Sequence, residues 1–262
     1  MKKIFSFLAI AAMVFAACNK TPKPTPKPDD EGGDEGGNEE QEYVAPITID
    51  GDFADWATLG SKAVSAKTDP NANWDAVKEI RCYSDEAYVF YYIEFNSAQI
   101  GELVAAATGT NDEGEKIGLP IRLCINTDGE FESGYANYFA QAYDFIIEGS
   151  LAEDGAWKSF DGVMHQRIGS WVALQEFGLC TGAGKDNKYE ICLVRDSFNG
   201  AAMKSEVTMP MGEVFQTGIR FYTPDWGELS NMPNTAPNPD SEIKAEQKGW
   251  GNLLEIHTVA ID

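Results

Sequence analysis

Short runs of apolar residues, typical of β-strands, recur along this chain and limit the folds it can adopt. The run "EAYVFYYIEF" (86–95) is apolar on both faces of an extended strand. One face holds Val89, Tyr91, Ile93 and Phe95, and the other holds Tyr88, Phe90 and Tyr92. Because only a strand covered on both sides can bury two apolar faces, we predict a central strand here.

Similar runs follow, each short, rich in aromatic or β-branched residues and bounded by Gly, Asn, Asp or Pro. They are "GLPIRLCIN", "AYDFIIEG", "KYEICLVRD", "EVFQTGIRFYT" and "LLEIHTVAID". One segment, "SAQIGELVAAATG", is predicted to be a helix. Ser97 can cap its N-terminus, and its apolar residues form a stripe along one side. Many strands with one or two short helices predict an all-β fold, a single antiparallel β-sandwich, with a closed barrel as the alternative.

The first 17 residues read as an export signal. Lys2 and Lys3 precede an apolar run, and Ala16 and Ala17 precede Cys18. The apolar run is too short for a membrane-spanning helix, which needs about 20 residues. The stretch "VFAAC" resembles the lipobox of bacterial lipoproteins, which implies a lipidated Cys18 and anchoring to a membrane, most simply the outer membrane. The alternative is an ordinary secretory signal with a chance cysteine.

Residues 18–42 are predicted to be a lipidated cysteine followed by a disordered tether. After Cys18, this segment contains no aromatic or aliphatic residue, so it cannot bury enough surface to offset its ordering entropy. Its first half is rich in Pro and its second half in Gly and acidic residues. The sequence leaves open whether the tethered domain faces the periplasm or the exterior.

Residues 43–262 are predicted to form the single folded domain, and it is strongly acidic. This segment holds 15 of the 20 basic residues and 34 of the 42 acidic ones, which gives about −19. Such a charge excludes nucleic acid as a partner and argues against polyanionic glycans, because phosphate and sulfate binding depends on Lys and Arg.

Four cysteines lie inside the domain: Cys82, Cys124, Cys180 and Cys192. Their spacing does not match a compact disulfide framework, and none of them form a CxxC element. Cys124 and Cys192 lie in the middle of apolar runs, where a free cysteine behaves as a small apolar residue. We expect free thiols, with one or two disulfides as the alternative.

Three segments, in order along the chain, carry a resemblance to a known superfamily. They are "ITIDGDFADW" (47–56), "RLCINTDGEFESGYANYFAQAYDFIIEGSL" (122–151) and "YEICLVRDSF" (189–198). Together they resemble the β-sandwich superfamily of family-nine carbohydrate-binding modules and DOMON domains. The resemblance implies an immunoglobulin-like or jelly-roll-like sandwich. We read Ile47 and Ile49 as a first strand, Asp50-Gly51-Asp52 as a turn, and Trp56 as a core residue.

The turn "INTDGEFESGY" is a candidate calcium loop. Asn126 and Asp128 supply oxygen side chains at alternate positions, and Asp144 is a plausible partner on the neighbouring strand. Calcium takes six to eight oxygen ligands. The alternative is a polar hairpin turn in which Asp and Gly only set the backbone. A structural Ca²⁺ is the one cofactor that the sequence suggests.

Tryptophans in Gly-, Pro- or Asn-rich segments give the main indication of function. An exposed indole is a flat apolar platform for a sugar ring, and neighbouring polar side chains can bind the hydroxyls. The predicted ligand-binding residues are Trp226, Trp171, Trp157, Tyr222, Glu228 and Asn231. The alternative for each tryptophan is that it fills a gap between a loop and the core.

No catalytic residues are predicted. The sequence has no GxSxG, HExxH or Walker motif, and its two histidines are far apart. We therefore predict a non-catalytic lipoprotein that recognises a neutral saccharide through loop tryptophans. The alternative is a structural or protein-interaction subunit of a surface uptake or adhesion complex; a glycoside hydrolase is a third, weaker reading.

Overall fold

The computed structural model describes ten ranges of the chain: 43–69, 75–130, 134–135, 139, 141–166, 172–195, 211–234, 236–237, 248–250 and 252–261. The predicted signal peptide, Cys18, the tether and Trp171 lie outside the described residues. Within these ranges, no helix is long and apolar enough to cross a membrane.

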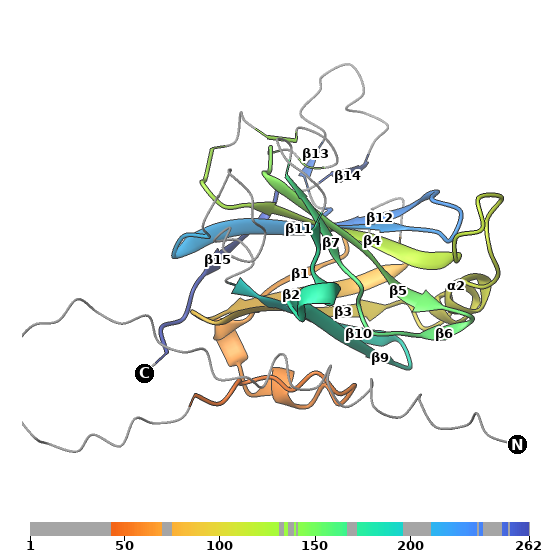
Figure 1. Cartoon of the computed structure of the whole chain (residues 1–262). Helices are drawn as coiled ribbons and strands as arrows, with labels where there is room; N and C mark the ends of the chain where they lie inside the picture. The colour runs from red at the N-terminus through yellow and green to blue at the C-terminus, as the bar shows by residue number, and fades with distance from the viewer. Residues whose placement is uncertain are drawn as a thin grey trace, which may run out of the picture.

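The fold is an all-β sandwich of two antiparallel sheets (Figure 1). The first sheet, sheet A, has the order β1-β2-β3-β10-β9, and its strands are β1 (Val64–Lys67), β2 (Val77–Ser84), β3 (Tyr88–Phe95), β9 (Cys180–Lys185) and β10 (Lys188–Val194). The second sheet, sheet D, has the order β12-β11-β4-β5-β7-β8. Its strands are β4 (Gly118–Asn126), β5 (Phe145–Glu153), β7 (Val163–Gln166), β8 (Val172–Ala173), β11 (Val214–Tyr222) and β12 (Glu228–Met232).

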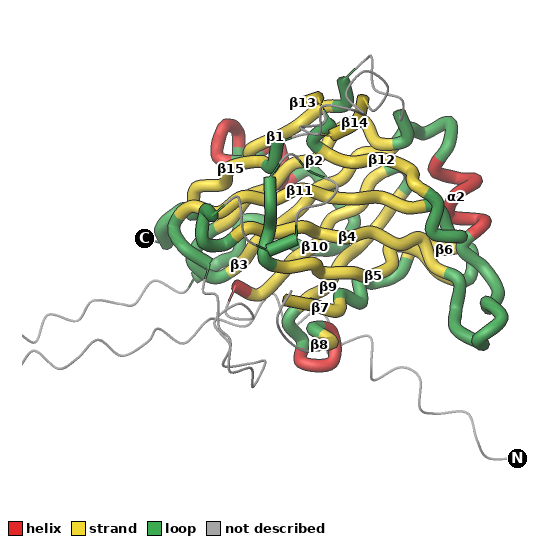
Figure 2. Tube along the Cα trace, turned by 90° about the horizontal axis from the view of Figure 1, so that it is seen from above, coloured by secondary structure: helices red, strands yellow, loops and turns green. Residues whose placement is uncertain are grey.

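Shorter elements complete the two layers. The strand β15 (Leu254–His257) pairs with the first half of β11, and β6 (Ala156–Trp157) pairs with the end of β5. A separate small ribbon consists of β13 (Ala236–Pro237) and β14 (Lys248–Trp250). Three 3₁₀ turns are η1 (Asp55–Ala57), η2 (Gly60–Lys62) and η3 (Gln175–Phe177). The helix α2 (Ile100–Ala106) lies beside β6 at one edge of the sheets (Figure 2).

The main core lies between the two sheets, and alternate residues of each strand point into it. On β4, the inward residues are Leu119, Ile121, Leu123 and Ile125. The prediction for 86–95 is confirmed: β3 lies between β2 and β10, and its odd-numbered apolar residues enter this core. The two sheets remain separate, so the sandwich is correct and the closed barrel is not.

A second apolar cluster covers the outer face of sheet A. It joins Tyr88, Phe90 and Tyr92 of β3 to Ile47, Ile49 and Trp56 of the N-terminal segment 43–59. This segment lies across the outer side of the lower layer (Figure 1). The predicted strand at Ile47 and Ile49 is wrong, because these residues bury their side chains against the face of the sheet and pair with no strand.

Glu190 of β10 holds the N-terminal segment in place from within the second cluster. Its side chain is fully buried. Oε1 accepts hydrogen bonds from the N–H groups of Asp50 and Gly51 at 3.0 and 2.9 Å, and Oε2 accepts one from the Trp56 indole at 3.2 Å. Gly51 has φ of +81°, a conformation that favours glycine. The predicted turn at 50–52 and the burial of Trp56 are therefore confirmed.

Two smaller predictions have opposite outcomes. The helix starts at Ile100 with Gln99 as its N-cap residue, so the predicted cap at Ser97 is wrong. No side chain of the described residues caps the helix. The Asn96 backbone carbonyl accepts hydrogen bonds from the N–H groups of Gln99 and Ile100 just before it. The four domain cysteines are free and buried, as expected.

Candidate functional site

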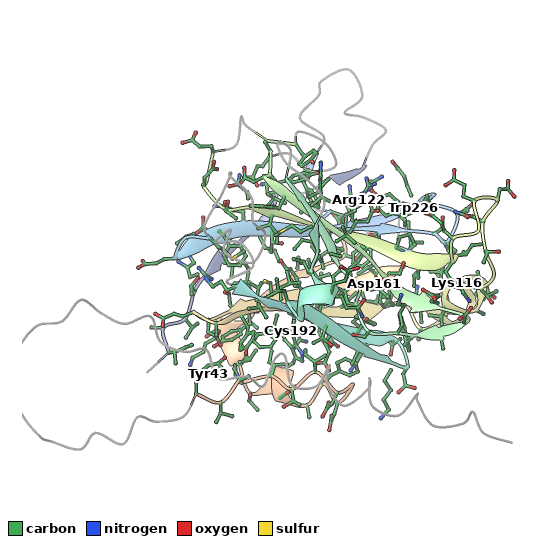
Figure 3. The ribbon with its side chains drawn as sticks, in the orientation of Figure 1. Tyr43, Lys116, Arg122, Asp161, Cys192 and Trp226 are labelled. Atoms are coloured by element: carbon green, nitrogen blue, oxygen red, sulfur yellow. The ribbon has the colours of Figure 1, made fainter. Side chains whose placement is uncertain are left out.

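The outer face of sheet D is divided into two parts. Near the start of β5, an apolar cluster covers it; its buried members are Cys124, Phe139, Tyr143, Ile146 and Leu253. Nearer the β11–β12 turn, the same face carries Arg122, Glu148 and Tyr222, which alternate with the core residues of β4, β5 and β11. This second part is the candidate site (Figure 3).

Trp226 is the most prominent side chain of the site. It lies in the turn between β11 and β12 and is 49% exposed, unusual for a large apolar residue. Its ring packs at 5.3 Å from the ring of Tyr222, which is almost fully buried. The Arg122 guanidinium lies 5.5 Å from the Trp226 ring and 5.3 Å from the Tyr222 ring. These contacts hold the indole at the surface.

The turn forces Trp226 into an unusual backbone conformation. Its φ is +65°, in the left-handed region that bulky residues rarely adopt. Hydrogen bonds from the Trp226 N–H to the Thr223 carbonyl, and from the Thr223 N–H to the Gly227 carbonyl, close the turn. The Thr223 hydroxyl also donates to Asp225, which lowers the pKa of that carboxyl. The turn is held independently of the exposed ring.

Two ion pairs lie beneath the aromatic pair. Arg122 Nε donates to Glu148 Oε2 at 2.7 Å, and Arg122 Nη1 donates to the Tyr222 hydroxyl at 3.2 Å. Arg220 is almost fully buried and pairs with the exposed Glu228. Arg220 Nη1 also donates to Asn231 Oδ1 at 2.8 Å. Both guanidinium groups lie 5.3 Å from the centre of the Tyr222 ring, within the range of cation–π contacts.

An open pocket of about 590 Å³ adjoins Trp226. Its floor comes from Gly118 and Pro120 of β4 and Ser150 of β5. One wall is the loop that follows α2, and the other is the turn that carries Trp226. The pocket is lined by Ala106, Asn111, Glu115, Lys116, Ile117, Gly118, Pro120, Ser150, Pro224, Asp225 and Trp226. Its volume is in the range of about 300–1,000 Å³ that is usual for small-molecule sites.

The structure brings four of the six predicted ligand-binding residues together. Trp226, Tyr222 and Glu228 lie at the candidate site, and Asn231 lies beneath it. Asn231 is fully buried, so its side chain is connected to the candidate site only through its hydrogen bond with Arg220.

Trp157 lies elsewhere, and its surroundings favour the gap-filling alternative. Its ring contacts the rings of Phe95 and Tyr189 at 5.9 and 5.4 Å on the side of the main core. The predicted residue Trp171 lies outside the described residues.

Sequence reasoning missed Arg122, Glu148 and the pocket loop around Lys116. The run "GLPIRLCIN" already placed Arg122 on the face opposite the core, and that was the available signal. Its pairing with Glu148 requires the register of β4 against β5, in which the two residues are direct partners. No short-range pattern contains that register.

The predicted calcium loop forms a hydrogen-bonded turn. Asn126 Oδ1 accepts from the Gly129 N–H at 2.7 Å, and Asp144 Oδ2 accepts from the N–H and hydroxyl of Thr127 at 2.7 and 3.1 Å. Asp128 Oδ1 accepts from the Glu130 N–H at 2.8 Å. Burial raises the pKa of Asp144.

These hydrogen bonds account for the turn without an ion. The described ranges contain no group of three or more His, Cys, Asp or Glu side chains that could hold a metal ion. Calcium at Asn126, Asp128 and Asp144 therefore stays a prediction of the sequence.

Comparisons with known proteins place the chain in no family. No family model matches it. Over 126 residues it is 27% identical to a very long-chain fatty acid transport protein of Cochliobolus heterostrophus, and the match covers 44% of this chain and 19% of that protein. A solved structure from Bacteroides uniformis, of a protein provisionally described as carbohydrate-binding, aligns over 84% of this chain and 88% of its own. Its TM-score is 0.37 and its sequence identity 10%. The resemblance to family-nine modules stays a prediction.

Proposed function

We propose that this protein binds a saccharide without acidic groups at the outer face of sheet D and that it does so without catalysis. The observation that carries the proposal is the exposed indole of Trp226 beside a pocket of about 590 Å³. Sugar rings have apolar C–H faces that pack on aromatic rings, while their hydroxyls need hydrogen-bonding partners. Asn111, Ser150 and Glu228 are polar residues in or near the site that suit such hydroxyls.

The charges of the site support binding rather than catalysis. Glu148 and Glu228 are each held in an ion pair with an arginine. A glycosidase needs one free carboxylate and one protonated carboxylic acid on the two sides of the scissile bond. Because arginines already engage both carboxylates, this pair does not match the arrangement that a glycosidase needs.

The alternative partner is another protein of a surface complex. A protein interface of that kind requires a broad apolar patch. Among the described residues, the exposed large apolar side chains are Val44, Val214 and Trp226, and the last two lie at opposite ends of β11. Because these exposed apolar side chains form no broad patch, they favour a saccharide over a protein as the partner.

The predicted export signal and Cys18 indicate the cellular location that we propose. Export by residues 1–17 and lipidation of Cys18 would attach the domain to a bacterial membrane, most simply the outer membrane, through the tether of residues 18–42.

A binding panel tests the proposal. The purified chain with Cys18→Ser, which cannot be lipidated, should bind at least one neutral or amino saccharide in affinity gels, and Trp226→Ala should weaken that binding at least tenfold. Val214→Ala is the matched control, since it also shortens an exposed apolar side chain but at the other end of β11. Absence of binding across a broad panel would refute the proposed function.

A further inference from the structure

The basic side chains around the pocket are already neutralised. Three of them lie in the pocket or beside it, and each pairs with a carboxylate at 2.5 to 2.7 Å. The pairs are Lys116–Asp154, Arg122–Glu148 and Arg220–Glu228. Little positive charge is left to attract an anionic ligand.

Two carboxylates of the pocket have no such compensation. Glu115, from the loop after α2, and Asp225, from the turn that carries Trp226, both line the pocket, and neither forms an ion pair in the part of the chain that the structure describes. Asn111 donates to Glu115 from its side chain, and Thr223 donates to Asp225. These neutral donors leave both negative charges in place. The charge of about −19 on residues 43–262 adds a negative background field.

We infer that the pocket takes a saccharide with a positively charged amino group, such as a glucosamine unit whose nitrogen is not acetylated. This inference rests on the proposed saccharide function and narrows its ligand class. Glu115 and Asp225 would neutralise the ammonium, and the sugar ring would pack on Trp226. An aromatic face also attracts a cation directly, and indole does so most strongly.

Other charge classes fit the same pocket less well. A uronic acid would meet two uncompensated carboxylates, and like charges in one pocket disfavour binding. A neutral sugar could still pack on Trp226, but it would leave the charges of Glu115 and Asp225 unpaired. We therefore expect neutral sugars to bind, and amino sugars to bind more tightly.

The test compares two ligands that differ only in acetylation. Calorimetric titrations of the full chain carrying Cys18→Ser would use the fully deacetylated chitosan tetrasaccharide and its N-acetylated counterpart at about pH 6. The deacetylated ligand should bind roughly tenfold more tightly at low salt. The ratio should shrink as ionic strength rises, because salt screens exposed charges.

Variants locate the effect. Asp225→Asn and Glu115→Gln should each lower the affinity for the deacetylated ligand by about threefold and leave the N-acetylated ligand unaffected. Asn at 225 can still accept the hydrogen bond from Thr223, so the turn is kept. Glu213→Gln is the matched control, since it removes an equal exposed charge at the opposite end of β11 and should change neither affinity.

The outcomes separate the two proposals. Equal affinity for both ligands, or tighter binding of the N-acetylated one, would refute the inference and leave the saccharide function standing. A preference for the deacetylated ligand that Asp225→Asn and Glu115→Gln leave unchanged would refute the assigned pocket residues. Failure of every saccharide to bind would instead refute the proposed function.

Discussion

At the scale of single residues, Glu190 is a buried acid surrounded by hydrogen-bond donors. Two backbone N–H groups and the Trp56 indole favour its carboxylate, whereas burial favours the neutral acid. Burial is the larger effect and raises the pKa of Glu190 to about 7. The residue is therefore both the anchor of the N-terminal segment and a titrating group.

The raised pKa predicts a pH-dependent stability. Between its ordinary value of 4.5 and about 7, the native state binds a proton that the unfolded chain releases. The stability that Glu190 contributes by binding this proton is full below pH 4.5 and is lost as the pH rises through about 7. It amounts to at most about 3 kcal/mol.

Urea unfolding at pH 5 and pH 8 measures this contribution. The natural chain should lose more stability between the two values than Glu190→Gln, which cannot titrate. An identical pH dependence in the two proteins would exclude Glu190 as the group responsible.

Asp144 gives a second test at this scale, because it is the acceptor for two donors of Thr127 and is almost fully buried. Asp144→Ala should lower the free energy of unfolding by about 1–3 kcal/mol, the cost of unsatisfied buried donors. Asp128→Ala, on the exposed side of the turn, should lower the free energy of unfolding by less.

The Asp144→Ala variant also tests the predicted calcium site. If the unfolding midpoint of the natural chain rises in millimolar Ca²⁺ and that of Asp144→Ala does not, the ion predicted from the sequence is present.

At the scale of elements, the β11–β12 hairpin presents Trp226 in a strained conformation. A non-glycine residue in the left-handed region costs about 1–2 kcal/mol. Trp226→Gly and Trp226→Ala both remove the indole, but only glycine also relieves the strain. The Gly variant should therefore be about 1 kcal/mol more stable than the Ala variant in thermal or urea unfolding, and both should bind saccharide at least tenfold more weakly than the natural chain. Equal stability would mean that the turn does not hold residue 226 at positive φ.

The elements that the sequence predicts well are those whose burial is visible in a local pattern. The two apolar faces of β3 and the alternation of β4 need no long-range information, because side chains on a strand alternate with period two. The segment at Ile47 and Ile49 has the same local pattern but no strand to pair with, so its apolar residues cover a sheet face instead. The site was predicted only as far as its aromatic turn, because its ion pairs join residues from different strands.

At the scale of the whole molecule, the first described residue of the domain and the candidate pocket lie on different sides. Tyr43 starts the described domain and donates a hydrogen bond to Asp85 at 2.7 Å. Tyr43 and the pocket residues Lys116 and Trp226 lie on opposite sides of the view in Figure 3. The point where the predicted tether joins the domain therefore lies away from the candidate pocket.

Metabolic labelling tests the proposed lipidation of Cys18. Cells that express the natural chain should incorporate labelled palmitate into it, and cells that express Cys18→Ala should not. Lys20→Ala, two residues further on, is the matched control and should be labelled normally. Labelling that persists in Cys18→Ala would place the lipid on another residue.

The four buried cysteines have a consequence for where this protein can work. None of them is in a disulfide, so they add no covalent cross-link to the apolar packing, hydrogen bonds and ion pairs of the sandwich. A disulfide typically contributes about 2–4 kcal/mol to the stability of a folded domain, and these four cysteines contribute none of that kind. The thermal midpoint of the domain should be the same with and without dithiothreitol. Reducing surroundings should therefore leave the packing of the sandwich unchanged, whereas a domain cross-linked by disulfides would lose stability there.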